Sequence, residues 1–182
     1  VETLSFDDGD IAVSHDGTGL VLVGQSTDNI EVVGSVGVTV LGEAGDDALT
    51  GGDGNDTIAG GEGDDTLTGG YGSDDLEGGS GSDTVYGGEG ADFIDGDDGS
   101  DTLFGEGGTD DIIGGVGDDL IDGGFGSDVL DGAEGDDTLL GEDGSDTLIG
   151  GTGSDVIDGG FDHDVAVFAG HQSDYTFTSS ED

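Results

Sequence analysis

The chain contains no lysine and no arginine, so nearly all of its charges have one sign. Its 182 residues include 46 aspartates and glutamates and three histidines, which gives a formal net charge of −46. No internal salt bridge to Lys or Arg can form, and self-repulsion opposes a compact state. Nucleic acids and anionic membranes are not expected partners, because both are polyanions. If the chain folds, cations from outside must take part.

Other absences narrow the possibilities further. There is no cysteine, which excludes disulfides and thiolate zinc sites. Hydrophobic residues make up 30% of the chain and aromatic residues 5%, against roughly 45–50% apolar residues in an ordinary domain. No apolar run approaches the ~20 residues of a membrane span. In plain buffer this composition predicts a disordered chain.

What the chain has instead is a strict repeat rich in glycine and aspartate. From Gly42 to Asp158 it divides into thirteen consecutive nonamers without an insertion or deletion. The first and fourth residues are always Gly, the second is Gly in eight nonamers, and the eighth is always Leu, Ile or Val. The sixth residue is always aspartate: Asp47, Asp56, Asp65, Asp74, Asp83, Asp92, Asp101, Asp110, Asp119, Asp128, Asp137, Asp146 and Asp155.

Each nonamer predicts one turn and one short strand. Glycines at the first, second and fourth positions allow positive φ and close backbone approach, and so make a tight turn. Positions seven to nine suit a three-residue strand, with the eighth side chain inside and its neighbours outside. Two nonamers, 18 residues, then complete one coil, so residues 42–158 would form six and a half coils. We therefore expect an all-β parallel solenoid with a thin apolar core.

Stacking the coils brings aspartates close together. Asp56 and Asp74 are 18 residues apart and would lie one above the other, as would Asp65 and Asp83. Two bare carboxylates at that spacing repel and do not stay ionised without help. A divalent cation between them removes the repulsion, and glycine-turn carbonyls supply further oxygen ligands. Such an all-oxygen site suits Ca²⁺ better than Mg²⁺.

The phrase G-G-x-G-x-D-x-(aliphatic)-x resembles the RTX (repeats-in-toxin) calcium-binding nonapeptide. The resemblance covers residues 42–158 and implies a right-handed parallel β-roll. It also implies Ca²⁺ between adjacent coils, held by the thirteen aspartates and by carbonyls near the second and fourth positions. A site needs coils on both sides, which allows at most about 11 inter-coil sites. The implied carbonyl ligands are Gly52, Gly54, Gly61, Gly63, Gly70, Gly72, Gly79, Gly81, Gly88, Gly90, Gly99, Gly108, Gly115, Gly117, Gly124, Gly126, Gly135, Gly144, Gly151 and Gly153.

Six positions depart from the pattern. The second residue is not glycine at Glu43, Asp97, Glu106, Ala133 and Glu142, which puts the turn geometry there in question. Gly107 occupies a third position and is a softer departure.

The flanks predict β-rich capping segments at both ends. Residues 1–41 are interpreted as an N-terminal cap or the end of a preceding module, with Val38 where an aspartate would stand and hence a coil without calcium. Residues 159–182 are a degenerate repeat followed by capping strands, and residues 164–175 resemble the segment that often closes RTX arrays. Because both ends stop in mid-pattern, we expect a fragment of a larger protein. The strands expected in these flanks cover residues 11–13, 20–23, 30–33, 38–41, 165–168 and 175–177.

The sequence favours a binding module over an enzyme. His15, His163 and His171 lack the spacing of a zinc site, and no G-x-S-x-G elbow occurs, so no catalytic residue is assigned. We expect a module that folds on binding Ca²⁺ outside the cell and supports a larger secreted bacterial protein, by type I secretion according to the resemblance. Its partners would be calcium ions and neighbouring domains of the same polypeptide.

Two alternatives remain open: a calcium-stiffened structural or adhesive spacer that assembles end to end, and an accessory module of a secreted protease, lipase or polysaccharide-modifying enzyme. Ice binding is disfavoured because the third and fifth positions are mixed.

Overall fold

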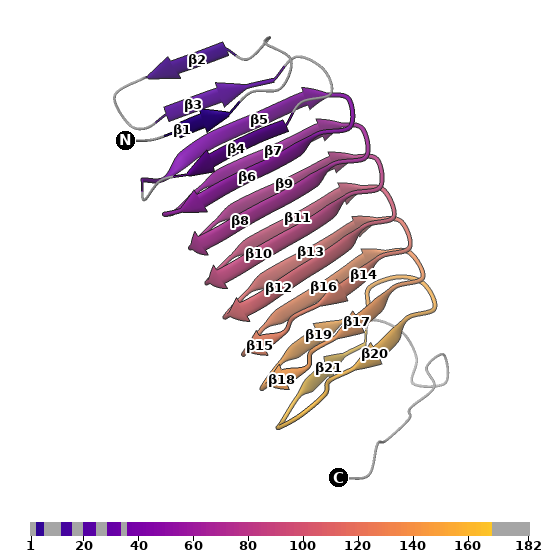
Figure 1. Cartoon of the computed structure of the whole chain (residues 1–182). Coiled ribbons are helices and arrows are strands. Elements are labelled where there is room, and N and C mark those ends of the chain that lie inside the picture. Colours follow the sequence, from indigo (N-terminus) through magenta and orange to yellow (C-terminus); the bar gives the residue numbers. More distant parts are fainter. Residues whose placement is uncertain (1–2, 6–11, 16–19, 25–28, 34–35, 169–182) are drawn as a thin grey trace.

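The computed structural model describes residues 3–5, 12–15, 20–24, 29–33 and 36–168. Every regular element among them is a β-strand, and the coils stack along one axis (Figure 1). In this described part of the chain, no helix is long and apolar enough to cross a membrane. The strands predicted for 175–177 and the residue His171 lie outside the described residues.

The strands form two sheets. The first sheet runs in the order β1 (Thr3–Ser5), β4 (Asn29–Val33), β6 (Ala48–Asp53), β8 (Thr66–Gly72), β10 (Thr84–Gly90), β12 (Thr102–Gly108), β14 (Leu120–Asp122), β17 (Thr138–Leu140) and β20 (Val156–Asp158), with β15 (Phe125–Gly126) and β18 (Asp143–Gly144) beside it. The second sheet runs β2 (Ala12–His15), β3 (Leu20–Val23), β5 (Val38–Ala44), β7 (Thr57–Glu62), β9 (Asp75–Ser80), β11 (Phe93–Asp98), β13 (Asp111–Val116), β16 (Val129–Glu134), β19 (Thr147–Ile149) and β21 (Val165–Val167).

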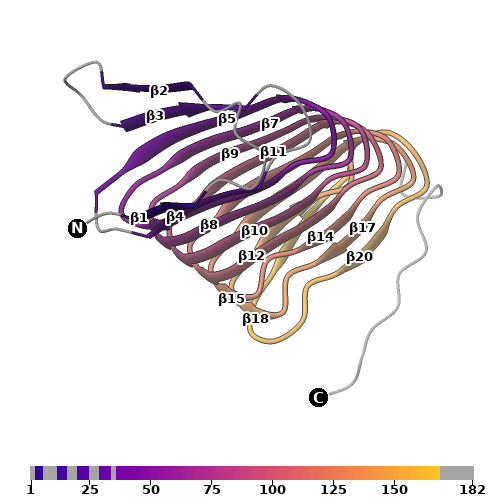
Figure 2. The same ribbon diagram turned by 45° about the horizontal axis from the view of Figure 1, so that its top comes forward.

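Successive strands of the repeat alternate between the sheets, so the chain winds as a solenoid (Figure 2). Neighbouring strands pair in parallel and equivalent residues are 18 apart, as in Leu49 beside Leu67 and Ile58 beside Leu76. The predicted parallel solenoid with 18 residues per coil is confirmed. It has about eight turns, more than the repeat alone supplies, because β3, β4 and β21 extend it.

The N-terminal ends of both sheets carry antiparallel strands. β1 pairs antiparallel with β4, and β2 pairs antiparallel with β3. The strand predicted at residues 20–23 has the same bounds as β3, and the one predicted at 38–41 opens β5. Both sheets therefore begin on a strand whose direction differs from the strands of the roll.

The core is a single column of aliphatic side chains between the sheets. In β7, Thr57 is exposed, Ile58 buried and Ala59 half-buried, as strand alternation requires. The twelve eighth-position side chains from Leu49 to Leu148 are all buried, and Ile157 packs against them. The alternation continues past position nine, so the first-position glycines also face inward. The interior thus consists of sixth, eighth and first positions.

The strands are longer than the three residues predicted. Typical strands such as β7 and β10 continue from position seven into the third or fourth position of the next nonamer. The backbone stays paired round the bend, with Gly61 beside Gly79, because glycines place no side chain between the coils. Within the repeat, three-residue strands occur only late in the stack, at β14, β17, β19 and β20, and β21 beyond it has the same length.

Candidate metal centres along two aspartate ladders

The sixth-position aspartates form two ladders, one leading into each sheet. Asp47, Asp65, Asp83, Asp101, Asp119, Asp137 and Asp155 precede strands of the first sheet. Asp56, Asp74, Asp92, Asp110, Asp128 and Asp146 precede strands of the second, followed by Asp164 of the degenerate repeat. From Asp47 to Asp146 these side chains are only 1–3% exposed. Buried carboxylates at this density require compensation.

One oxygen of each carboxylate is tied to the neighbouring coil. The Oδ1 of Asp74 accepts the backbone N–H of Asp56 at 2.8 Å, and that of Asp101 accepts the N–H of Asp83 at 2.8 Å. The same bond recurs along both ladders at 2.7–3.2 Å. At the start of one ladder Val38 donates to Asp56 at 2.7 Å without contributing a carboxylate itself.

The other oxygen has no such bond. Among the described residues no hydrogen-bond partner is found for the buried Oδ2 atoms of Asp56, Asp65, Asp74, Asp83, Asp92, Asp101, Asp110, Asp119, Asp128, Asp137, Asp146 and Asp155. Leaving a buried charged oxygen unsatisfied is costly. These atoms therefore need a proton or a cation.

Main-chain carbonyls flank each carboxylate, as Asp101 shows. An ideal Cβ placed on Gly96 would stand 2.6 Å from the Oδ2 of Asp101 and 2.5 Å from the carbonyl oxygen of Gly114, one coil later. A Cβ on Gly99 would stand 2.9 Å from the Oδ1 of Asp101 and would overlap the carbonyl of Gly81, one coil earlier. The carboxylate thus lies among oxygens from both adjacent coils.

The predicted carbonyl ligands fall into two groups in the structure. Fourth-position carbonyls, such as Gly108 near Asp128, do lie beside the aspartates. Some second-position carbonyls accept a backbone hydrogen bond from the next coil. The carbonyl of Gly124 accepts the N–H of Asp143 at 2.9 Å, and that of Ala133 accepts the N–H of Thr152 at 2.7 Å. First-position carbonyls, which the sequence analysis did not name, also lie near the aspartates, as Gly114 does near Asp101. The invariance of that position is the signal that could have pointed to them.

Positive φ, one of the two reasons predicted for the first-position glycines, is wrong. They do not have left-handed backbone, whereas the second positions and all fourth positions but Gly99 do, as at Gly61 (φ 116°) and Gly63 (φ 135°). A Cβ on Gly60 would overlap the Oδ2 of Asp65. The first position must be glycine because the aspartate carboxylate occupies the space of a side chain.

Four copies of the RTX calcium-binding nonapeptide repeat match the chain, at residues 39–67, 68–103, 104–139 and 131–166. The chain belongs to the RTX calcium-binding repeat family. RTX repeats bind Ca²⁺, and their β-roll is a structural calcium-binding module rather than a catalytic fold. No curated protein matches the chain.

The donor set of this RTX roll fits calcium bound by carboxylate and backbone oxygens. Within the described ranges no group of three or more His, Asp or Glu side chains is arranged to hold a metal. An ion at the ladders would therefore need oxygen ligands besides the carboxylates, and the flanking carbonyls can supply them. Oxygen-only coordination by carboxylates and carbonyls is what Ca²⁺ prefers. The partnerless Oδ2 atoms and the flanking carbonyls provide those donors.

The RTX turn persists where its second glycine is replaced. Glu43, Asp97, Glu106, Ala133 and Glu142 all keep left-handed backbone, with φ between 66° and 76°. The turn geometry that the sequence put in question is therefore retained. An L-residue pays about 1–2 kcal/mol for this conformation. These five turns are strained relative to their glycine counterparts.

Burial favours the protonated form of the RTX ladder aspartates. Desolvation raises the pKa of Asp101 and of Asp110 to about 7, opposed by the backbone N–H that each accepts and reinforced by aspartates in adjacent coils. The pKa of Asp56, Asp83 and Asp137 rises to about 6 for the same reasons. Calcium binding requires ionised carboxylates, so it must displace these protons.

Proposed function

We propose that this RTX module is a calcium-controlled folding switch of a larger secreted bacterial protein. The observation that carries the proposal is the series of buried Oδ2 atoms without a hydrogen-bond partner, in a chain that has no Lys or Arg. No basic side chain of the chain can compensate these charges. An external divalent cation can do so in every coil at once.

In this proposal the thirteen sixth-position aspartates provide the carboxylate ligands between adjacent coils. Carbonyls of the fourth and first positions complete the sites, with those of the second position as further candidates. Calcium supplies positive charge at the carboxylates; the chain supplies the spacing, because its 18-residue register repeats the same oxygens in each coil. At most about 11 ions would bind.

The calcium concentration would determine whether the chain folds inside or outside the cell. Where calcium is scarce, repulsion within a chain of net charge −46 opposes folding. Extracellular modules bind Ca²⁺ with dissociation constants of about 10⁻⁴–10⁻³ M. Binding that occurs only in the folded state stabilises that state. The chain would thus stay unfolded inside the cell, as export by a type I system requires, and would fold outside.

A calcium titration tests the proposal. Far-ultraviolet circular dichroism at pH 7.4 and physiological salt should show a coil-to-β transition with a midpoint of about 10⁻⁴–10⁻³ M. Magnesium at the same concentrations is the control and should not produce it. Folding in a chelator at this pH, or a midpoint below about 10⁻⁶ M, would contradict a switch that acts outside the cell.

A stiff spacer is a second candidate. The 18-residue register persists without slippage from β5 to β21, which gives a continuous stack rather than a jointed one. Small-angle scattering in calcium should then show one rigid rod. A bent or compact particle would count against this role but not against calcium-dependent folding.

A further inference from the structure

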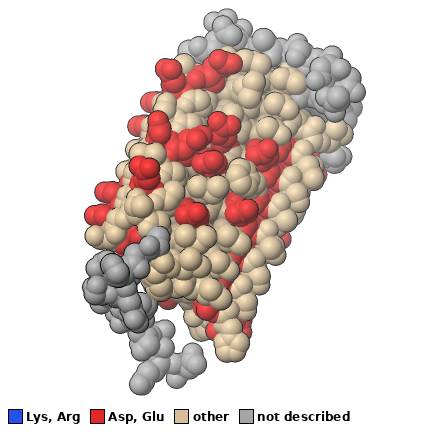
Figure 3. Space-filling view, turned by 180° about the vertical axis from the view of Figure 1, so that it is seen from behind, with Lys and Arg blue, Asp and Glu red and all other residues tan. Residues whose placement is uncertain are grey.

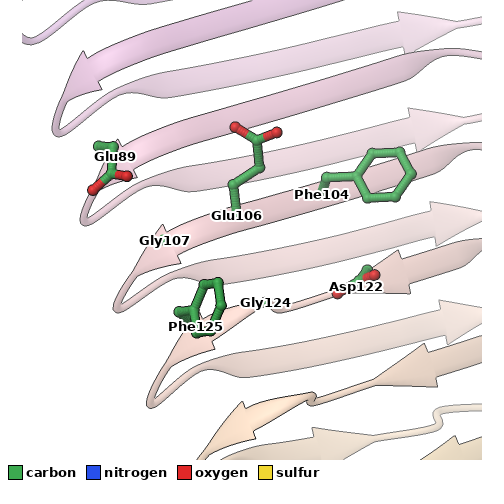
Figure 4. A pocket seen from close by; sticks show the side chains of 7 residues that line it. All are labelled: Glu89, Phe104, Glu106, Gly107, Asp122, Gly124 and Phe125. Carbon is green, nitrogen blue, oxygen red and sulfur yellow. The ribbon is translucent and has the colours of Figure 1, made fainter.

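A hollow of about 430 Å³ opens on the outer face of the first sheet, apart from the aspartate ladders (Figure 4). Its walls carry the carboxylates of Glu89, Glu106 and Asp122 and the rings of Phe104 and Phe125. A second hollow of about 390 Å³ shares Asp122 and Phe125 and adds Glu142 and Asp143. The two form one acidic and aromatic groove along the stack.

The hollow exists because one side chain is missing from a column. Third-position residues of the first sheet lie above one another, so that Gly107 is between Glu89 and Phe125. An added Cβ at Gly107 would meet nothing closer than the Glu89 carboxyl group at 3.7 Å, and its backbone is not left-handed. Unlike the glycines of the turn, Gly107 is not required by the backbone. The absence of a side chain at Gly107 leaves the space of the hollow open.

The groove combines negative charge with aromatic surface. Tyr86 stacks on Phe104 with ring centroids 5.1 Å apart and ring planes 8° apart, and Phe125 is 68% exposed. Burial raises the pKa of Asp122, against the N–H of Gly124. One face of the molecule, seen from behind, carries many acidic side chains and, as the composition requires, no Lys or Arg (Figure 3). The side chains that line the hollow offer acceptors and ring faces but no donor.

We propose that this groove binds the guanidinium group of an arginine side chain from a partner protein. Guanidinium is planar, stacks on aromatic rings and donates to carboxylates in pairs. A second copy of the chain cannot be the partner through this contact, because it has no Lys or Arg. A neutral sugar would leave the three carboxylates uncompensated.

The probe is the peptide acetyl-Gly-Arg-Gly-amide, added to the full chain in saturating calcium while circular dichroism monitors the fold. We expect its NMR shifts to concentrate on the rings of Phe104 and Phe125. The same peptide with citrulline, which is isosteric and uncharged, should bind at least about tenfold more weakly. Equal binding of the two peptides would overturn the proposal.

Filling the hollow is the sharpest variant. Gly107→Tyr places a tyrosine at a third position without backbone strain. The same column already holds a tyrosine at an equivalent position, Tyr71. Affinity for the arginine peptide should fall about tenfold or more while the calcium midpoint stays unchanged. Unaltered affinity would place the binding elsewhere.

Matched pairs of variants distinguish direct contact between the groove and the arginine peptide from general attraction by the negative charge of the chain. Glu106→Gln with Asp122→Asn removes two wall charges; Glu43→Gln with Asp131→Asn removes the same two charge types from equivalent second and ninth positions of the second sheet. Phe125→Ala is matched by Phe161→Ala, since Phe161 is 69% exposed and in the same column. Only the first member of each pair should weaken binding. Equal losses within the pairs, or ring shifts produced by a neutral oligosaccharide and not by arginine, would refute the proposal.

Discussion

The middle and the C-terminal end of the roll are built from the same nonamer, yet they differ in strand length and in the burial of their core side chains. In the middle, β12 has seven residues and the eighth-position Leu103 is fully buried; near the end, β20 has three residues and the eighth-position Ile157 is only half-buried. The phrase around each strand is nearly the same, so local sequence does not explain the difference. The eighth position is fully buried where a coil has a coil on both sides and only half-buried in the last coil of the first sheet, which is typical of repeat proteins.

The largest expected effect is that of pH on the metal-free roll. The folded-state pKa values of ladder aspartates lie above the unfolded value, so the protonated ladder stabilises the fold below about pH 4. That contribution is lost as pH rises through about 6 at Asp137 and about 7 at Asp101. In a chelator, β signal in circular dichroism should therefore disappear between about pH 5 and pH 8. NMR should show the C-terminal coils melting first; unfolding at low pH instead would reverse the sign and contradict the burial of the ladders.

The next largest effect is expected from truncating a core side chain, because the loss of unfolding free energy should differ between the middle and the end of the roll. Leu103→Ala removes a fully buried side chain with coils on both sides, and should cost about 2–5 kcal/mol of unfolding free energy in calcium. Ile157→Ala removes a half-buried side chain near the end, and should cost about 1 kcal/mol. Urea unfolding measures both. Equal costs would mean that the terminal coil is as well packed as the middle.

Neutralising one ladder aspartate should favour folding in a chelator and weaken folding in calcium. Asp101→Asn keeps an acceptor for the N–H of Asp83 but removes a buried charge. In a chelator it should raise the pH at which the β signal disappears; in calcium it should raise the titration midpoint about two- to tenfold. Asp155→Asn, at a half-buried end position, should change both much less. A lower calcium midpoint for Asp101→Asn would be inconsistent with its role as a ligand.

The smallest effect concerns the strained second positions. Ala133→Gly relieves a left-handed φ of 67°, and should stabilise the roll by about 0.5–1 kcal/mol after the entropy of the unfolded chain is counted. Thermal unfolding in calcium measures this shift. Ala59→Gly, at a strand position without positive φ, is the control and should destabilise instead.

The sequence alone predicted the parallel solenoid, its 18-residue register and the inward eighth side chains, because each follows from the period. It did not predict the strand lengths, since a glycine in the pattern does not reveal whether the backbone stays paired there. It also assigned Gly60 and its equivalents to positive φ, when the reason is the space that Asp65 occupies. The groove at Gly107 was not predicted: the 18-residue period places Gly107 between Glu89 and Phe125, but it does not show that the surrounding side chains leave a hollow there.

A crystal structure of the calcium-loaded chain, with anomalous diffraction collected to locate the ions, would show which oxygens hold them. We predict anomalous peaks between adjacent coils beside the Oδ2 atoms of the two ladders, with carbonyl oxygens at about 2.3–2.6 Å. Peaks confined to exposed carboxylates, with the ladder Oδ2 atoms free of metal, would show that the buried aspartates are not the calcium ligands.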